Sequence, residues 1–161
     1  VVEMATTSGT ASPSACGQAM TSTVTIRSTT NAQGAPTNPQ ATAVSYVSDG
    51  LNIYFGCGKT SQKARNLARD AKVSVAITLP YTDWSQIRGV SLSGRAKRVT
   101  APPEIKRISR LMLRKFPQIA DYASPFEEGI AFFRVTPRIV SILDYSKGFG
   151  HTELVRVPRA A

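Results

Sequence analysis

The chain has 161 residues, of which 42% are hydrophobic, and it carries a formal net charge of +10. That length suits one domain with a core of its own. No apolar run approaches the roughly 20 residues that a membrane-spanning helix needs, so we expect no membrane association. Two cysteines and a single histidine provide neither a metal-binding spacing nor a disulfide framework. We therefore predict reduced thiols, no metal and a cytoplasmic location.

The first segment of the chain lacks any structural period. Residues 1–21 are rich in Ser, Thr, Ala and Gly, and Glu3 is their only charged side chain. Such a composition cannot bury enough apolar surface to offset the entropy of ordering. We predict a flexible N-terminal tail over residues 1–21 and a single folded domain over residues 22–161.

Strand patterns come next. Residues 23–28 alternate polar and apolar side chains, and a turn signal at 31–34 separates them from a second strand at 40–47. Asp49 and Gly50 then form a dipeptide that favours a tight antiparallel hairpin, which leads into a third strand at 51–55. The sequence therefore predicts an antiparallel sheet from its first strands onward.

A short basic helix follows the third strand. The turn Gly56-Cys57-Gly58 precedes it, and Thr60 or Ser61 is a suitable N-cap for a helix that reaches about residue 71. Free N–H groups at the start of a helix, together with the positive end of its dipole, attract anions. Lys63 lies in that first turn, so this segment is a candidate phosphate site.

The second half of the chain continues the β pattern. Strands are predicted at 73–79 and 86–100, and Gly94 inside the latter indicates a bulge or a close approach by other atoms. Pro102 and Pro103 can open a helix that ends near residue 116, and a short helical stretch is expected at 118–123. Two closing strands, 130–135 and 139–143, are predicted to flank a turn at residues 136–137, and a loop is expected at 144–151. Together these elements predict a mainly β fold, an antiparallel barrel of about six strands with two or three inserted helices.

The order of these motifs resembles the flavin-binding split barrels related to pyridoxamine 5′-phosphate oxidase. The resemblance rests on the hairpin, the glycine-rich turn, the Thr-Ser-Gln-Lys helix start and the Val-Ser-Val-Ala strand that begins at Val73. The segment 84–96, with its mid-strand glycine, and the closing segment 133–140 are also similar. The resemblance covers roughly residues 23–143, and it implies a six-stranded Greek-key split β-barrel that binds FMN at a homodimer interface.

The resemblance also implies which residues hold the cofactor. The FMN phosphate would lie against Ser61, Gln62 and Lys63, and Arg88 would approach from a later strand. The strand at 40–45 and the glycine turn would line the isoalloxazine ring, through Gln40, Ala43, Val44, Ser45, Gly56 and Cys57.

The chain departs from the true oxidases at two places. They carry an arginine where this chain has Gln62, and their C-terminal substrate clamp has no counterpart around residues 142–145. The prediction is therefore an FMN-binding, oxidoreductase-like protein that acts on a small redox substrate. The substrate and any catalytic residue are left open, because a flavin would carry the chemistry itself.

Two other functions are compatible with the sequence. A split barrel could hold a deazaflavin or a haem, although the only histidine, His151, lies in the C-terminal segment. The charge of +10 also suits a non-enzymatic nucleic-acid binder, with basic side chains gathered on the helix at 103–116. Aromatic residues are not interleaved with those charges, so nucleic acid is the less favoured partner.

Overall fold

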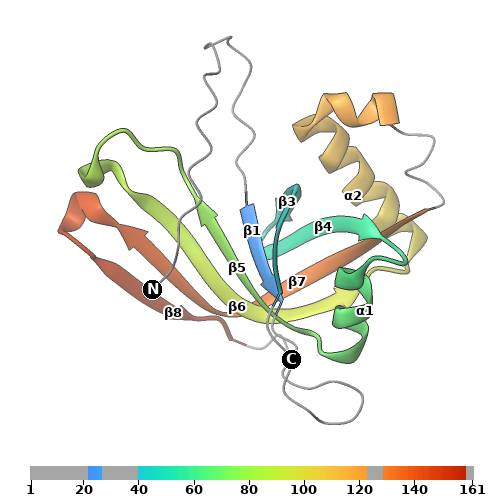
Figure 1. Ribbon diagram of the computed structural model, residues 1–161, viewed down its shortest axis with the longest axis horizontal. Helices are drawn as coiled ribbons and strands as arrows, with labels where there is room; N and C mark the ends of the chain where they lie inside the picture. The colour runs from blue at the N-terminus through green and yellow to red at the C-terminus, as the bar shows by residue number, and fades with distance from the viewer. Residues whose placement is uncertain (1–21, 27–39, 123–128, 159–161) are drawn as a thin grey trace.

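The computed structural model describes residues 22–26, 40–122 and 129–158. The predicted tail at 1–21 and the predicted turn at 31–34 lie outside these ranges. The described strands form one antiparallel sheet in the order β2-β1-β5-β6-β7-β4-β3, with β8 paired to β7 (Figure 1). The strands are β1 (Ser22–Ile26), β2 (Gln40–Val44), β3 (Tyr46–Asp49), β4 (Asn52–Gly58), β5 (Lys72–Thr78), β6 (Arg88–Arg98), β7 (Ile130–Asp144) and β8 (Thr152–Arg156).

The sheet closes on itself because its two ends belong to neighbouring stretches of chain. β2 and β3 lie at opposite ends of the strand order, yet only Ser45 separates them in the sequence. A sheet whose end strands must meet in this way has to curl, and Figure 1 shows the resulting curvature. The predicted mainly β split barrel with inserted helices is confirmed.

The described residues include two complete α-helices, which are inserted between the strands. Helix α1 (Gln62–Arg69) has Ser61 as its N-cap, which is one of the two residues predicted for that position. Helix α2 (Pro102–Lys115) opens with proline in its first turn, where the missing N–H costs no hydrogen bond. The described part of the chain also contains three 3₁₀ turns, namely η1 (Trp84–Gln86), η2 (Pro117–Tyr122) and η3 (Tyr145–Lys147).

Strand β7 corrects the sequence analysis at the C-terminal end. The predicted turn at residues 136–137 is wrong, because β7 runs unbroken through Pro137 for 15 residues. The register with β6 shifts between Ser93 and Gly94, so Arg138 is an extra residue and Pro137 lies at a bulge. Proline is tolerated at a bulge because no ladder hydrogen bond is required of it. The predicted loop at 144–151 agrees with the segment between β7 and β8, which contains η3, but the strand β8 that follows it was not predicted.

Two apolar cores lie on opposite sides of β4. Phe55 faces the barrel interior, where its ring stacks on Phe133 at 5.6 Å between centroids. The next side chain along, Tyr54, faces the other way and packs with Ile108 and Met112 of α2. Because consecutive residues of β4 are held by different cores, the end of this strand is firmly positioned. That end is where the candidate site begins.

Polar contacts fix α2 against the sheet. The hydroxyl of Tyr54 donates to Glu104 of α2 at 3.2 Å, and Arg134 of β7 donates to the same carboxylate at 3.0 Å. Burial, together with the Glu104 carboxylate, raises the pKa of Tyr54.

Basic side chains of α2 are also engaged with the hairpin, where Arg107 pairs with Asp49. Lys115 donates to the carbonyl of Tyr46 at 3.0 Å and lies 3.7 Å from the centre of its ring. Several basic groups of α2 are thus engaged within the protein, which reduces what a nucleic acid could contact.

Candidate functional site

A pocket of about 380 Å³ lies where β2, the end of β4 and the start of α1 meet. Three of its lining residues, Ser61, Gln62 and Lys63, are the predicted phosphate ligands, and Cys57 was predicted beside the ring. Ala41 and Thr42 of β2 complete the lining. The fold therefore brings three separate segments of the predicted site together at one place.

The start of α1 leaves backbone donors at this pocket. The Ser61 hydroxyl accepts from the N–H of Ala64 at 3.2 Å, and its carbonyl accepts from Arg65 at 3.1 Å. Gln62 and Lys63 precede these residues, so their N–H groups have no acceptor within the helix. Two backbone donors and the positive end of the helix dipole are therefore available to an anion.

The ammonium group of Lys63 lies in the same place. Burial lowers the pKa of Lys63, and the nearby Cys57 opposes this shift. The nitrogen lies 5.9 Å from the centre of the Phe55 ring, and no carboxylate of the described residues pairs with it. A partly desolvated cation without an acidic partner gains most from a bound anion.

The side chain of Gln62 is held by its neighbours on α1. Its amide nitrogen donates to Asn66 at 2.7 Å, and its amide oxygen accepts from Arg65 at 3.0 Å. Arg65 also donates to the carbonyl of Thr60 at 2.7 Å. Gln62 therefore offers the pocket mainly its backbone N–H.

The remaining predicted residues lie around the pocket or away from it. Gln40 and Ala43 belong to β2 on either side of Ala41 and Thr42, and Ser45 follows that strand. Val44 packs against the interior core. A Cβ atom on Gly56 would meet Ile130 and Phe132, so this glycine adjoins the side chains on the α2 side of the sheet.

Arg88 is placed outside this pocket in the single chain. It begins β6, and its guanidinium contacts Asp144 at 3.2 Å and the hydroxyl of Ser146 at 3.3 Å. Hydrogen bonds from Ser146 and the charge of Arg88 hold the pKa of Asp144 below its usual range. The contact of Arg88 with a cofactor stays a prediction, and it would require a second copy of the chain.

An exposed aromatic cluster lies near Arg88. Trp84 is 64% exposed and stacks on Phe149, which is 80% exposed, with 5.8 Å between ring centroids. The ring of Tyr145 lies beside that of Phe149, with 5.2 Å between their centroids. The exposure of Trp84 excludes it from the core of the single chain.

The described residues show neither a cluster of metal ligands nor a helix that could span a membrane. These ranges hold no group of three or more His, Cys, Asp or Glu side chains suited to a metal ion. None of their helices is both long and apolar enough to cross a bilayer. His151 instead lies 3.1 Å from Glu153, whose carboxylate also accepts from Lys147 at 2.6 Å.

Comparison with known families identifies the fold of this chain. The sequence model of pyridoxamine 5′-phosphate oxidase matches residues 19–144, which include every strand except β8 and all of the candidate pocket. The chain belongs to the pyridoxamine 5′-phosphate oxidase family. No curated protein matches its sequence. The suspected resemblance is thereby confirmed at the level of the family.

Solved structures agree with the family fold. A haem-binding protein of Mycobacterium smegmatis matches with TM-score 0.67 and 21% identity over 85% of this chain, which spans only 52% of that protein. A conserved hypothetical protein of Mycobacterium tuberculosis matches with TM-score 0.65 and 26% identity, over 88% of this chain and 86% of the other. HutZ, the haem storage protein of Vibrio cholerae, matches with TM-score 0.58 and 19% identity, over 74% and 82%. Two of these three structures are named for haem although they share the fold of an oxidase family, so the fold alone does not identify the ligand.

Proposed function

We propose that this member of the pyridoxamine 5′-phosphate oxidase family binds FMN and serves as a flavin-dependent oxidoreductase. The observation that carries the proposal is the partly desolvated ammonium of Lys63, which pairs with no carboxylate of the described residues, beside the N–H groups at the start of α1. A phosphate monoester is an anion with several acceptor oxygens, and this arrangement supplies both charge and donors to it.

The remaining lining residues suit a flat aromatic ring. Ala41, Thr42 and Cys57 have small side chains, so a ring can approach the backbone of β2 and β4 closely. The flavin would supply the electron-transfer chemistry, and the protein would hold and orient it. The described residues that line this pocket include no acid–base pair, so the pocket does not indicate which substrate would react there.

We also propose a homodimer that covers exposed apolar side chains and completes the pocket. Strand β8 is exposed along its whole length, and Leu154 and Val155 are 66% and 46% exposed. Trp84 and Phe149 add an exposed aromatic pair. Apolar surface of this extent is typical of an interface. Light scattering at micromolar concentration should give the mass of two chains.

The decisive experiment compares FMN with riboflavin, which has the same ring and no phosphate. Titration of the purified protein, followed by quenching of flavin fluorescence, should show FMN binding at least about 10-fold more tightly, since a charge-assisted contact contributes roughly 1.5–3 kcal/mol. Protein that is colourless as purified and does not bind added FMN would overturn the proposal. Equal affinities for both flavins would mean that the protein makes no stabilising contact with the FMN phosphate.

The pH dependence of FMN binding tests the same ammonium group. The phosphate is doubly charged above about pH 7, so affinity should be level from there until Lys63 begins to lose its proton. Burial lowers the pKa of Lys63, so affinity should fall as pH rises through this lowered pKa, before the pH at which an exposed lysine titrates. Fluorescence titrations between pH 7 and pH 11 measure this, and Lys63→Met should abolish the fall.

Haem is the second candidate, because two of the similar structures are named as haem-binding or haem storage proteins. The only histidine of the chain, His151, is engaged with Glu153 and does not line the pocket. A hemin titration that gives a sharp Soret band, lost in His151→Ala and kept in Lys63→Met, would favour haem. A deazaflavin would use the same phosphate site, and a parallel titration with a deazaflavin cofactor distinguishes it from FMN.

A further inference from the structure

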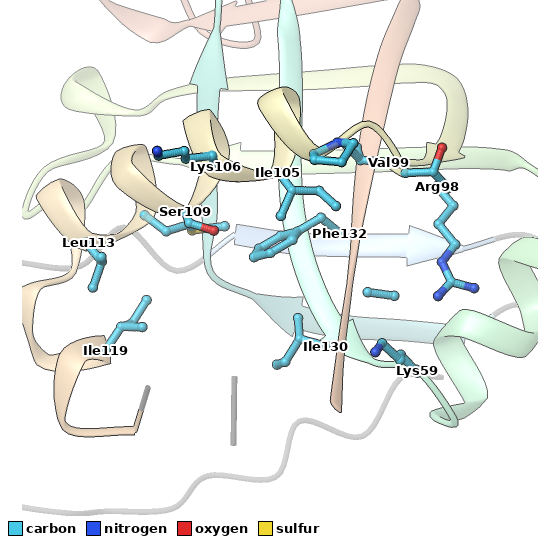
Figure 2. Close-up of a pocket in the computed structure, with 14 residues that line it drawn as sticks. Lys59, Arg98, Val99, Ile105, Lys106, Ser109, Leu113, Ile119, Ile130 and Phe132 are labelled. Carbon is cyan, nitrogen blue, oxygen red and sulfur yellow. The ribbon is translucent and has the colours of Figure 1, made fainter. Parts of the chain in front are cut away.

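A second and larger pocket lies between α2 and the sheet, on the side of β4 that faces away from the barrel interior. It has a volume of about 680 Å³, within the range of small-molecule sites. Its floor is formed by Ile130 and Phe132 of β7, and its wall by Ile105, Met112 and Leu113 of α2 (Figure 2). The candidate FMN pocket shares none of these residues.

The two ends of this pocket differ in chemistry. Figure 2 shows the guanidinium of Arg98 and the ammonium of Lys59 near one another at one end, and Leu113 with Ile119 at the other. Lys106 contributes a third cation on the α2 side. No Asp or Glu is among the described residues that line the pocket. The described lining is therefore largely apolar, with two basic side chains together at one end and Lys106 apart from them on α2 (Figure 2).

Glycine at position 56 helps to form the floor. A Cβ atom there would lie 3.2 Å from Ile130 and 3.3 Å from Phe132, closer than side chains normally pack. These two residues can therefore lie directly against β4. Leu113 is 41% exposed, so the apolar end of the pocket is partly in contact with water. An apolar chain bound there would remove this surface from water, which is favourable at roughly 25 cal/mol per Å².

We propose that this pocket binds a single-chain amphiphile with an anionic head group, such as a long-chain carboxylate or an alkyl phosphate. The alkyl chain lies along Phe132, Met112 and Leu113, and the head group lies at the Arg98 end. Charge complementarity selects an anionic head group, since a neutral or cationic one gains nothing from the basic side chains at that end. This site is independent of the FMN proposal.

The test uses dodecanoate, dodecyl phosphate and uncharged dodecanol as probes in calorimetric titrations of the full chain. Dodecanoate or dodecyl phosphate should bind with one site per chain and at least about 10-fold more tightly than dodecanol, as one charge-assisted contact allows. The two anionic probes distinguish a carboxylate ligand from a phosphate ligand. Failure of both to bind, or equal affinity for dodecanol, overturns the proposal.

Three variants locate the binding site. Arg98→Ala should reduce the preference for the anionic probes, whereas Arg95→Ala, on the same strand but outside the pocket, should leave it unchanged. Ser109→Trp should fill the pocket and abolish binding of all three probes, with an unaltered circular dichroism spectrum as evidence of a folded protein. If Ser109→Trp does not fold, Leu113→Glu at a partly exposed position serves the same purpose. Unchanged dodecanoate binding in these pocket variants contradicts the assignment.

Discussion

Replacement of Lys63 by methionine is expected to weaken FMN binding by roughly 10- to 100-fold, because a charge-assisted hydrogen bond contributes about 1.5–3 kcal/mol. Methionine is an unbranched side chain one atom shorter than lysine, so it can still pack near Phe55 while it removes the charge and the donors. Riboflavin has no phosphate, so its affinity should be the same for both proteins. Fluorescence titrations of both flavins against both proteins measure the difference.

The matched control is Lys72→Met, which removes an exposed lysine at the start of β5, outside the pocket. The control should bind FMN as the unaltered protein does, with the small loss that a change in net charge causes at low salt. Equal losses in Lys63→Met and Lys72→Met would mean that general electrostatic attraction, and not a specific contact, holds the phosphate.

The stability of Lys63→Met gives a second, independent readout. Burial penalises the charged form, so the folded protein releases the Lys63 proton at lower pH than the unfolded chain does. The unfolded state then binds more protons between the two pKa values, and stability rises with pH in that window. At neutral pH the penalty is fully present in the unliganded protein. Lys63→Met should therefore be at least as stable as the unaltered protein while it binds FMN less well.

Much of the fold could be predicted from local sequence patterns. The Asp49-Gly50 hairpin, the N-cap of α1 and the proline start of α2 depend on neighbouring residues, and each has a specific backbone requirement. Lys63 was found at the pocket for the same reason, since its position in a helical first turn can be read from the sequence. The family match then agrees with the order of these elements.

Features that depend on distant contacts were not predicted. Proline at position 137 reads as a turn, and only the pairing with β6 shows that it lies at a bulge inside β7. Ala41 and Thr42 were not singled out within β2, because which of its residues face the pocket depends on where the barrel closes. The pocket beneath α2 brings together residues from β6, α2 and β7, and no sequence spacing indicates it.

Substitution of Gly94 by alanine is expected to destabilise the protein by about 3 kcal/mol or more, the upper part of the range for overpacked positions. A Cβ atom at this position would collide with the carbonyl oxygen of Thr136 and would lie 3.0 Å from the Cα of Pro137. Both obstacles are backbone atoms of β7, so no side-chain rotation relieves the contact. Elsewhere an alanine in place of glycine stabilises by about 0.4–1 kcal/mol through the unfolded chain, and the predicted sign here is the opposite.

Urea denaturation followed by circular dichroism measures this effect, and Gly129→Ala is the control. A Cβ atom on Gly129 meets no atom of the described residues within 4 Å, so the stability of this variant should change by no more than about 0.5 kcal/mol. Similar midpoints for the two variants would show that β6 and β7 can separate without cost at the bulge. The bulge shares no residue with the FMN pocket, so Gly94→Ala protein that remains folded at low temperature should bind FMN with unaltered affinity. Lys63→Met is expected to weaken FMN binding without a loss of stability. The two variants would therefore distinguish residues that stabilise the barrel from residues that bind the proposed cofactor.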